Sequence, residues 1–287
     1  MSSPLTNLNV SAFTLSDAGG AYNYLGLLKM VSLRAANDLV DARGLTDRFA
    51  FNLAVKQGQA FDFVAYQASS NAFTTAPEPG MLNVPATNLD ITAWDLNGIA
   101  FLGRVKSGTI TAAIASRDQS ALADAYKSPV PLSNSLEISA DLMTLTYDAC
   151  LTTLLTGGAE EFTLAVTIAY GPVSLAAPMV LKSGRLTIER DAIQLENAVL
   201  HLQGTPTVTL AAGSGSLLAT ILTGNGQLGI SLNTGAAGYG DAYQTSASGS
   251  YAAAALLSRL TIAFAEGALI EQRGTLEVQG PLEVVPN

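Results

Sequence analysis

Few side chains in this sequence are of the types that carry out acid–base, nucleophilic or metal chemistry. The 287 residues include one histidine, His201, and one cysteine, Cys150. A single histidine excludes zinc motifs that need two, such as HExxH. Cys150 and His201 could act as a nucleophile and base only if the fold brings them together. We favour an inert buried thiol and a histidine on a strand face.

Two further patterns could bind a ligand. Gly224-Asn225-Gly226-Gln227-Leu228-Gly229 has the GxGxxG spacing of dinucleotide-binding loops. The segment after it is typical of a strand and a turn, whereas a pyrophosphate site needs a helix N-terminus there. We therefore favour a β-hairpin turn. Asp38 and Asp41 could recruit a cation, but they fit the wet face of a predicted helix better. The sequence thus predicts no catalytic, cofactor-binding or metal-binding residue.

The composition indicates a surface that is poor in charge. Charged residues make up 13% of the chain, against about 25% in average globular proteins. We expect Ser, Thr, Asn and Gln on part of the surface and neighbouring subunits over much of the rest. The net charge of −9 argues against binding to the nucleic-acid backbone, which needs clustered Lys and Arg. It is compatible with a surface past which DNA slides without adhering.

Alternation and turn signals predict a mainly β fold, sandwich-like or barrel-like, with one or two short helices. A helix is predicted over 20–43, where apolar residues recur at three- and four-residue spacing, although Leu25–Leu33 also fits a strand. A hairpin is predicted over 49–63 with its turn at 56–59. The predicted strands are 89–93, 99–105, 108–115, 136–140, 162–170, 185–189 and 198–203, with a second short helix at 119–127.

We expect two β-rich halves, 1–155 and 156–287, which can also be one continuous domain. The first half holds the predicted N-terminal helix and a proline-rich loop over 68–88. A duplication is possible, because Lys106–Thr111 and Leu200–Gly204 are each similar to a segment 76 residues later, Lys182–Thr187 and Leu276–Gly280.

The candidate interface residues come from three features. The long loop can reach a neighbouring subunit, Trp94 can anchor an interface or a core, and the stretch 197–258 contains one charged residue, Asp241. An uncharged β-prone stretch of this kind is an aggregation hazard unless partners cover it. The candidates are Trp94, Pro77, Pro79, Pro85, Tyr239, Tyr243 and Tyr251.

No secretory signal is visible at Met1–Asn7, and no apolar run approaches the roughly 18 residues of a membrane span. We therefore expect the chain to fold in a cytoplasm and to have no membrane partner.

The segment Phe101–Met143 resembles the central part of bacteriophage tail-tube proteins, in which a strand, a short helix with small polar residues, a loop and a returning strand follow one another. The resemblance implies a non-enzymatic β-sandwich subunit that forms stacked rings around a DNA conduit. Its partners would be itself and other virion proteins, with DNA only as passing cargo. The expected location is the virion, after synthesis in the host cytoplasm. A capsid decoration or shell protein, and a β-sandwich carbohydrate-binding or adhesive module, are the alternatives.

Overall fold

A computed structural model of the protein describes residues 10–17, 20–24, 27–43, 52–69, 85–121, 123–144, 164–190, 193–211, 215–234 and 249–286. Nearly all of the described elements are β-strands, which confirms the predicted mainly β class. The strands are β1 (Val10–Asp17), β2 (Gly20–Asn23), β3 (Leu28–Asp41), β4 (Asn52–Tyr66), β5 (Ile91–Leu96), β6 (Ile99–Ala100), β7 (Val105–Asp118), β8 (Pro129–Thr144), β9 (Leu164–Tyr170), β10 (Val173–Ile188), β11 (Ile193–Leu202), β12 (Thr207–Leu210), β13 (Gln227–Thr234), β14 (Gly249–Ala265), β15 (Glu271–Val278) and β16 (Glu283–Pro286). Two short 3-10 turns, η1 (Asn88–Asp90) and η2 (Leu102–Arg104), and one helix, α2 (Leu217–Thr223), complete the described elements.

The sheet is organised around β14. One edge of β14 pairs first with β13 and then with β7, and the other edge pairs with β16 and then with β15. From β7 the sheet continues through β8, β11, β10, β9, β5 and β6, and from β15 it continues through β4 to β3. Because β7 pairs with β14 and β8 with β11, strands from 1–155 and 156–287 belong to one hydrogen-bonded network.

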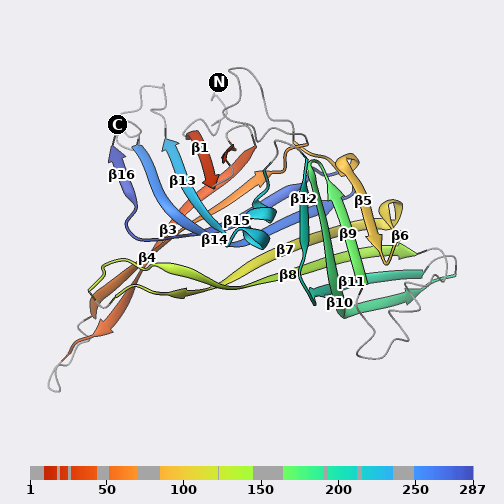
Figure 1. Ribbon diagram of the computed structural model, residues 1–287, viewed down its shortest axis with the longest axis horizontal. Helices are drawn as coiled ribbons and strands as arrows, with labels where there is room; N and C mark the ends of the chain where they lie inside the picture. Colours follow the sequence, from red (N-terminus) through yellow and green to blue (C-terminus); the bar gives the residue numbers. More distant parts are fainter. Residues whose placement is uncertain are drawn as a thin grey trace, which may run out of the picture.

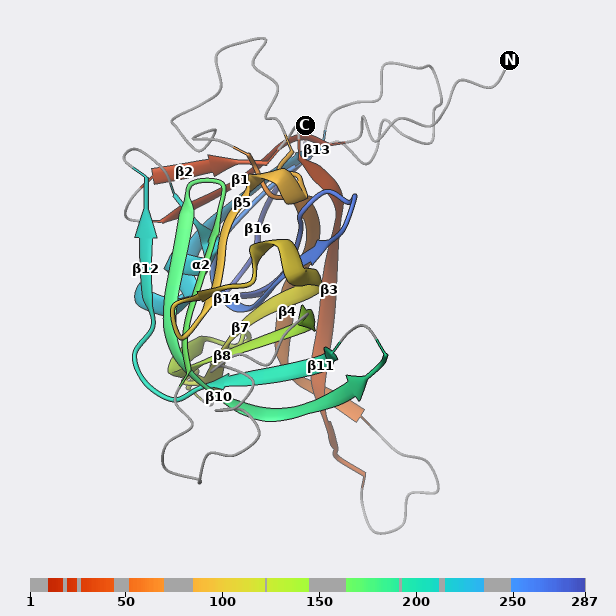
Figure 2. The same ribbon diagram turned by 90° about the vertical axis from the view of Figure 1, so that its right-hand side faces the viewer.

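The sheet folds back on itself, so that β5, β9 and β10 cover one side of β14 and β7. Figures 1 and 2 show β9, β10 and β12 running across the direction of β7 and β14. Trp94 on β5 and Tyr170 on β9 contact Phe264 of β14 edge-on, at 5.8 and 5.4 Å between ring centres. These T-shaped contacts join the two layers in the core.

Helix α2 fills part of the interior. Its apolar residues Leu217, Leu218 and Ile221 are all buried. Ser216 caps the helix by accepting a hydrogen bond from the Leu218 amide at 3.2 Å, and Gly224 ends it. No helix of the described ranges is long and apolar enough to cross a membrane.

The predicted helix at 20–43 is wrong, because β2 and β3 occupy this segment. Val31 and Leu33 of β3 lie opposite Phe63 and Phe61 of β4, so the apolar spacing reflects cross-strand pairing in place of a helical face. Tyr24, which began the helical pattern, is instead buried at the turn before β3. Tertiary pairing has overridden the local preference.

The predicted hairpin at 49–63 is also wrong, because β4 runs without a turn from Asn52 to Tyr66. Its residues 56–59 pair with β3, and the φ angle of Gly58 is not positive, as a tight hairpin turn would need. Phe61 and Phe63, two positions apart on β4, point to one face of the sheet and are both buried.

The remaining elements match the prediction unevenly. Residues 99–100, 108–115, 136–140, 164–170, 185–188 and 198–202 lie in strands as predicted. The short helix at 119–127 is wrong, since the described residues there form a turn that follows β7. Of the loop 68–88, residues 70–84 lie outside the described part, and Ala68 and Pro85 form an isolated bridge at its ends. The boundary at 155/156 and the internal duplication stay predictions.

Candidate assembly interface

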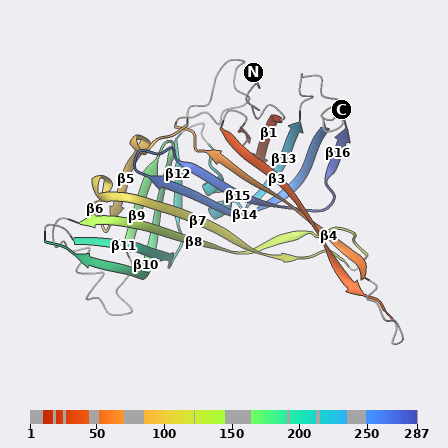
Figure 3. The same ribbon diagram turned by 180° about the vertical axis from the view of Figure 1, so that it is seen from behind.

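A two-stranded arm projects from the main body of the molecule. It consists of the distal halves of β3 and β4, which run past the point where β15 stops pairing with β4 (Figures 1 and 3). From residue 52 to residue 59, β4 pairs in this arm with β3, whereas residues 60–66 also pair with β15. We call the pairing of β3 with residues 52–59 of β4 the arm.

Large apolar side chains of the arm are exposed. Leu39 and Val40 of β3 are 59% and 53% exposed, and Leu53 and Val55 of β4 are 47% and 43% exposed. Val40 lies opposite Leu53, so these two side chains share one face of the ribbon. Leu39, next to Val40 along the strand, points to the other face. Both faces of the arm therefore offer apolar surface to solvent.

The turn between β7 and β8 is clasped at its base by Asp118. The Oδ1 of Asp118 accepts hydrogen bonds from the Ser120 amide at 3.0 Å, the Ser120 hydroxyl at 2.7 Å and the Ser128 amide at 2.9 Å. The side-chain bond from Ser120, followed by the two amides, holds the pKa of Asp118 well below its ordinary value. Lys56 of β4 donates to the Ser120 hydroxyl at 2.7 Å, so the clasp also reaches the arm.

The clasped turn is joined to the arm by backbone bonds as well. The Gln57 amide donates to Ala125 O at 2.9 Å, and the Lys127 amide donates to Gln57 O at 3.0 Å. The Lys127 ammonium lies 2.8 Å from the Asp38 carboxylate of β3. The β7–β8 end thus pairs with the inner edge of β4, which leaves β3 on the outside of the arm.

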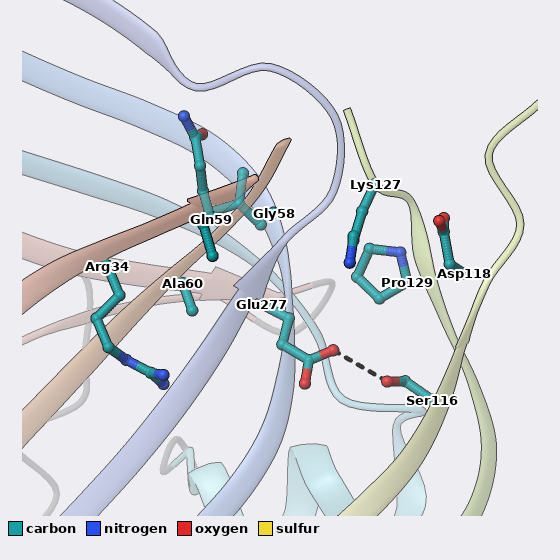
Figure 4. Close-up of a pocket in the computed structure, with 11 residues that line it drawn as sticks. Arg34, Gly58, Gln59, Ala60, Ser116, Asp118, Lys127, Pro129 and Glu277 are labelled. Atoms are coloured by element: carbon teal, nitrogen blue, oxygen red, sulfur yellow. Dashed lines mark hydrogen bonds between the residues drawn. The ribbon is translucent and has the colours of Figure 1, made fainter. Parts of the chain in front are cut away.

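A cavity of about 330 Å³ lies where the arm leaves the body (Figure 4). Small residues on β3 and β4, namely Ala36, Gly58 and Ala60, leave this space open. Its charged groups are paired within the chain: the Ser116 hydroxyl donates to Glu277 at 3.0 Å, and Arg34 binds Asp62. The Arg34 bond lowers the pKa of Asp62. Since each charge already has a partner, the cavity offers little to a charged ligand.

The three predicted interface residues that the structure describes lie in different places. Trp94 is 1% exposed and anchors the core, which is one of the two roles the sequence allowed. Tyr251 is partly buried against the core on β14, and Pro85 is partly buried beside Ala68. The others, Pro77, Pro79, Tyr239 and Tyr243, lie outside the described residues.

Where the structure describes them, the residues considered for chemistry lie on separate elements. His201 lies on β11 opposite Glu137 of β8, with its Nε2 2.9 Å from the carboxylate, and Cys150 lies outside the described residues. The GxGxxG segment leads from helix α2 into strand β13 through a turn with positive φ at Asn225 and Gly226. The predicted β-hairpin turn is wrong, because a helix and not a strand precedes the turn. A strand follows the segment, as the sequence indicated, so a pyrophosphate would meet no helix N-terminus.

The described side chains include no group of three or more His, Cys, Asp or Glu placed to hold a metal ion. No protein-family model matches the chain, and no curated protein matches its sequence. The arm is therefore the feature on which a functional argument rests. Sequence reasoning missed it because Leu39, Val40, Leu53 and Val55 are individually ordinary strand residues.

Proposed function

We propose that this chain is a structural protein of a virus particle that works by self-assembly, as a tail-tube subunit of a bacteriophage. The observation that supports the proposal most is the arm. The β7–β8 turn supports the inner edge of the arm, whereas no described strand pairs with its outer edge and apolar side chains are exposed on both of its faces. A second copy of the chain that covers these side chains would remove the exposed apolar surface.

The composition supports the same proposal. A chain with 13% charged residues and a net charge of −9 is poorly suited to remain a dispersed monomer. In the proposed assembly, neighbouring subunits cover the uncharged surface. The acidic balance would let DNA pass through the conduit as cargo without binding to its wall. Synthesis in the host cytoplasm and incorporation into the virion belong to this proposal.

The side chains of the outer sheet face suit this role. Thr109 and Ser139 share a hydrogen bond of 2.6 Å between β7 and β8, and Ser107 donates to Asp141 at 2.7 Å. Each of these bonds takes up one hydroxyl donor, and the Asp141 carboxylate adds a negative charge that repels a phosphate. An adhesive or carbohydrate-binding module would instead need exposed aromatic rings, and Trp94 is buried.

Electron microscopy of the purified protein tests the proposal. We expect wild-type protein to form rings or tubes of regular width. The double variant Val40→Thr/Leu53→Thr, which makes one face of the arm polar, should remain dispersed. Leu89→Gln is the matched control, because Leu89 is an exposed leucine outside the arm. Isolated wild-type particles at high concentration, or equal assembly by the arm variant, would contradict the proposal.

A further inference from the structure

The outer edge of β3 is a long row of backbone groups that no described strand pairs with. β3 spans 14 residues and pairs with β4 on one side; among the described residues it has no other strand neighbour. All of its residues except Leu28 and Val31 are exposed. Unpaired amide and carbonyl groups of this kind are a template for another strand. β3 contains no proline or glycine, and the bulge near its end places the extra residue, Val55, on β4.

The middle of β3 is complementary to itself when read in the opposite direction. The segment is Leu33-Arg34-Ala35-Ala36-Asn37-Asp38-Leu39. If two copies pair antiparallel with Ala36 opposite Ala36, Leu33 lies opposite Leu39 and Arg34 lies opposite Asp38. The two-fold axis makes each of these pairs occur twice. Apolar and opposite-charge cross-strand pairs both stabilise a sheet.

The register is also consistent with the hydrogen-bonding pattern. In an antiparallel pair, alternate residues direct their amide and carbonyl groups toward the same neighbour. In this register the positions of two opposing residues differ by an even number, as those of Arg34 and Asp38 do. Both residues of a pair therefore direct their amide and carbonyl groups to the same side of β3. Where one residue points these groups outward, so does the residue opposite, and the groups can form hydrogen bonds. A register centred on Arg34 would instead place two guanidinium groups opposite each other.

We infer that β3 pairs antiparallel with β3 of a second copy of this chain, with the two Ala36 residues facing each other. The inference names a partner for the outer edge of the arm, and it rests on the proposed self-assembly. The apolar faces of the arm, which include Val40 and Leu53, belong to a separate contact. Arg34 already binds Asp62, and Asp38 already binds Lys127 at 2.8 Å. Pairing therefore creates a row of alternating charge, Asp62–Arg34 of one copy followed by Asp38–Lys127 of the other.

The contact gives the arm the additional strands that it lacks. Two arms together form a four-stranded ribbon, which is more stable than either two-stranded ribbon alone. The pairing of opposite charges also disfavours other strands, because a partner without Asp and Arg at matching positions leaves Arg34 and Asp38 opposite neutral groups. A two-fold contact closes on itself, so a ring or tube needs further surfaces to grow.

Disulfide cross-linking tests the contact. Cys150 is the only cysteine, so Cys150→Ser gives a background in which Ala36→Cys supplies a single thiol. Opposing Cα atoms in an antiparallel pair lie about 4.5–5.5 Å apart, inside the range of about 4.4–6.8 Å that a disulfide spans. Ala35→Cys in the same background is the matched control, because residue 35 faces residue 37 of the other copy and its own counterpart is about 7–8 Å away.

Under mild oxidation we expect Ala36→Cys to form the covalent dimer at least about tenfold faster than Ala35→Cys, since only the first pair has disulfide geometry. Equal rates, faster cross-linking by Ala35→Cys, or no dimer from Ala36→Cys would each overturn the inference. Assembly of wild-type protein in the microscope with no cross-link at residue 36 would leave self-assembly standing and remove this contact. Monomeric wild-type protein with no cross-link would remove both.

Discussion

Removing the Asp118 carboxylate should loosen the connection between the arm and the β7–β8 turn. Asp118 accepts three hydrogen bonds, two from Ser120 and one from Ser128. A hydrogen bond to a charged group contributes roughly 1.5–3 kcal/mol when buried. Since this side chain is 34% exposed, water replaces part of the loss. We expect Asp118→Ala to cost about 1–2 kcal/mol locally, comparable to the loss of a strong helix cap.

The Gln57 amide reports on this change, because it donates to Ala125 O in the clasped turn. An opening that is easier by about 1–2 kcal/mol corresponds to hydrogen exchange that is roughly 5–30-fold faster. Asp124→Ala is the control, since Asp124 lies in the same turn and accepts a hydrogen bond from the Ala121 amide at 2.6 Å. Equal exchange at Gln57 in the two variants would refute the reasoning.

The same clasp has a predictable pH dependence. Its donors hold the pKa of Asp118 below the ordinary value of 3.8. The carboxylate therefore stabilises the clasp fully above that pH, and the contribution is lost as the pH falls through the lower folded-state pKa. After correction for intrinsic exchange rates, the difference between wild type and Asp118→Ala at Gln57 should shrink in this acid range. A difference that stays constant there would contradict the assignment.

Three further substitutions test the core and the sheet, each by urea denaturation. A Cβ at Gly274 would lie 2.2 Å from the Phe63 ring, so Gly274→Ala should destabilise the fold by about 1–3 kcal/mol, whereas Gly103→Ala, which meets no atom within 4 Å, should not. Asp141→Asn should lower stability by about 1 kcal/mol at neutral pH. Because its hydrogen bonds lower the pKa of Asp141, the difference should begin to shrink below about pH 4 and vanish only as the pH falls through the lower folded-state pKa. Tyr170→Phe should leave stability unchanged or raise it by up to about 1 kcal/mol, because the buried hydroxyl has no hydrogen-bond partner among the described residues; a clear loss would show that it has one.

The fold class could be predicted from the sequence because alternation is a local signal. Residues 108–115 and 136–140 alternate between core and surface, and they lie in β7 and β8 as predicted. The lengths were underestimated, since β7 runs from Val105 to Asp118 and β8 from Pro129 to Thr144. Their ends pair with each other beyond the core, where the apolar pattern stops but backbone pairing continues.

The pattern of 20–43 left both a helix and, over Leu25–Leu33, a strand open, and it could not decide between them. Tyr24, Leu27 and Leu28 satisfy helical spacing, yet Tyr24 contacts Phe13 of β1 and Phe63 of β4 in an aromatic cluster. That cluster depends on strands distant in sequence, so a local window does not contain it. The arm escaped prediction for the same reason, because the end of β15 at Val278 decides which part of β4 is left without a further strand.

The interface candidates show what composition can and cannot indicate. Low charge predicts that partners cover part of the molecule, but it does not indicate which part. Trp94, the most distinctive candidate by residue type, packs against Phe264 in the core. The exposed side chains Leu39 and Leu53 were not singled out, since an exposed leucine is identified only once the surrounding sheet is known.

The mass of the purified protein in solution, measured by light scattering over a range of concentrations, tests the central claim most directly. If copies of the chain cover one another through the arm, the mass should be a multiple of 29.6 kDa and should fall when Val40 and Leu53 are replaced by threonine. A single stable species of 29.6 kDa at every concentration would contradict the account.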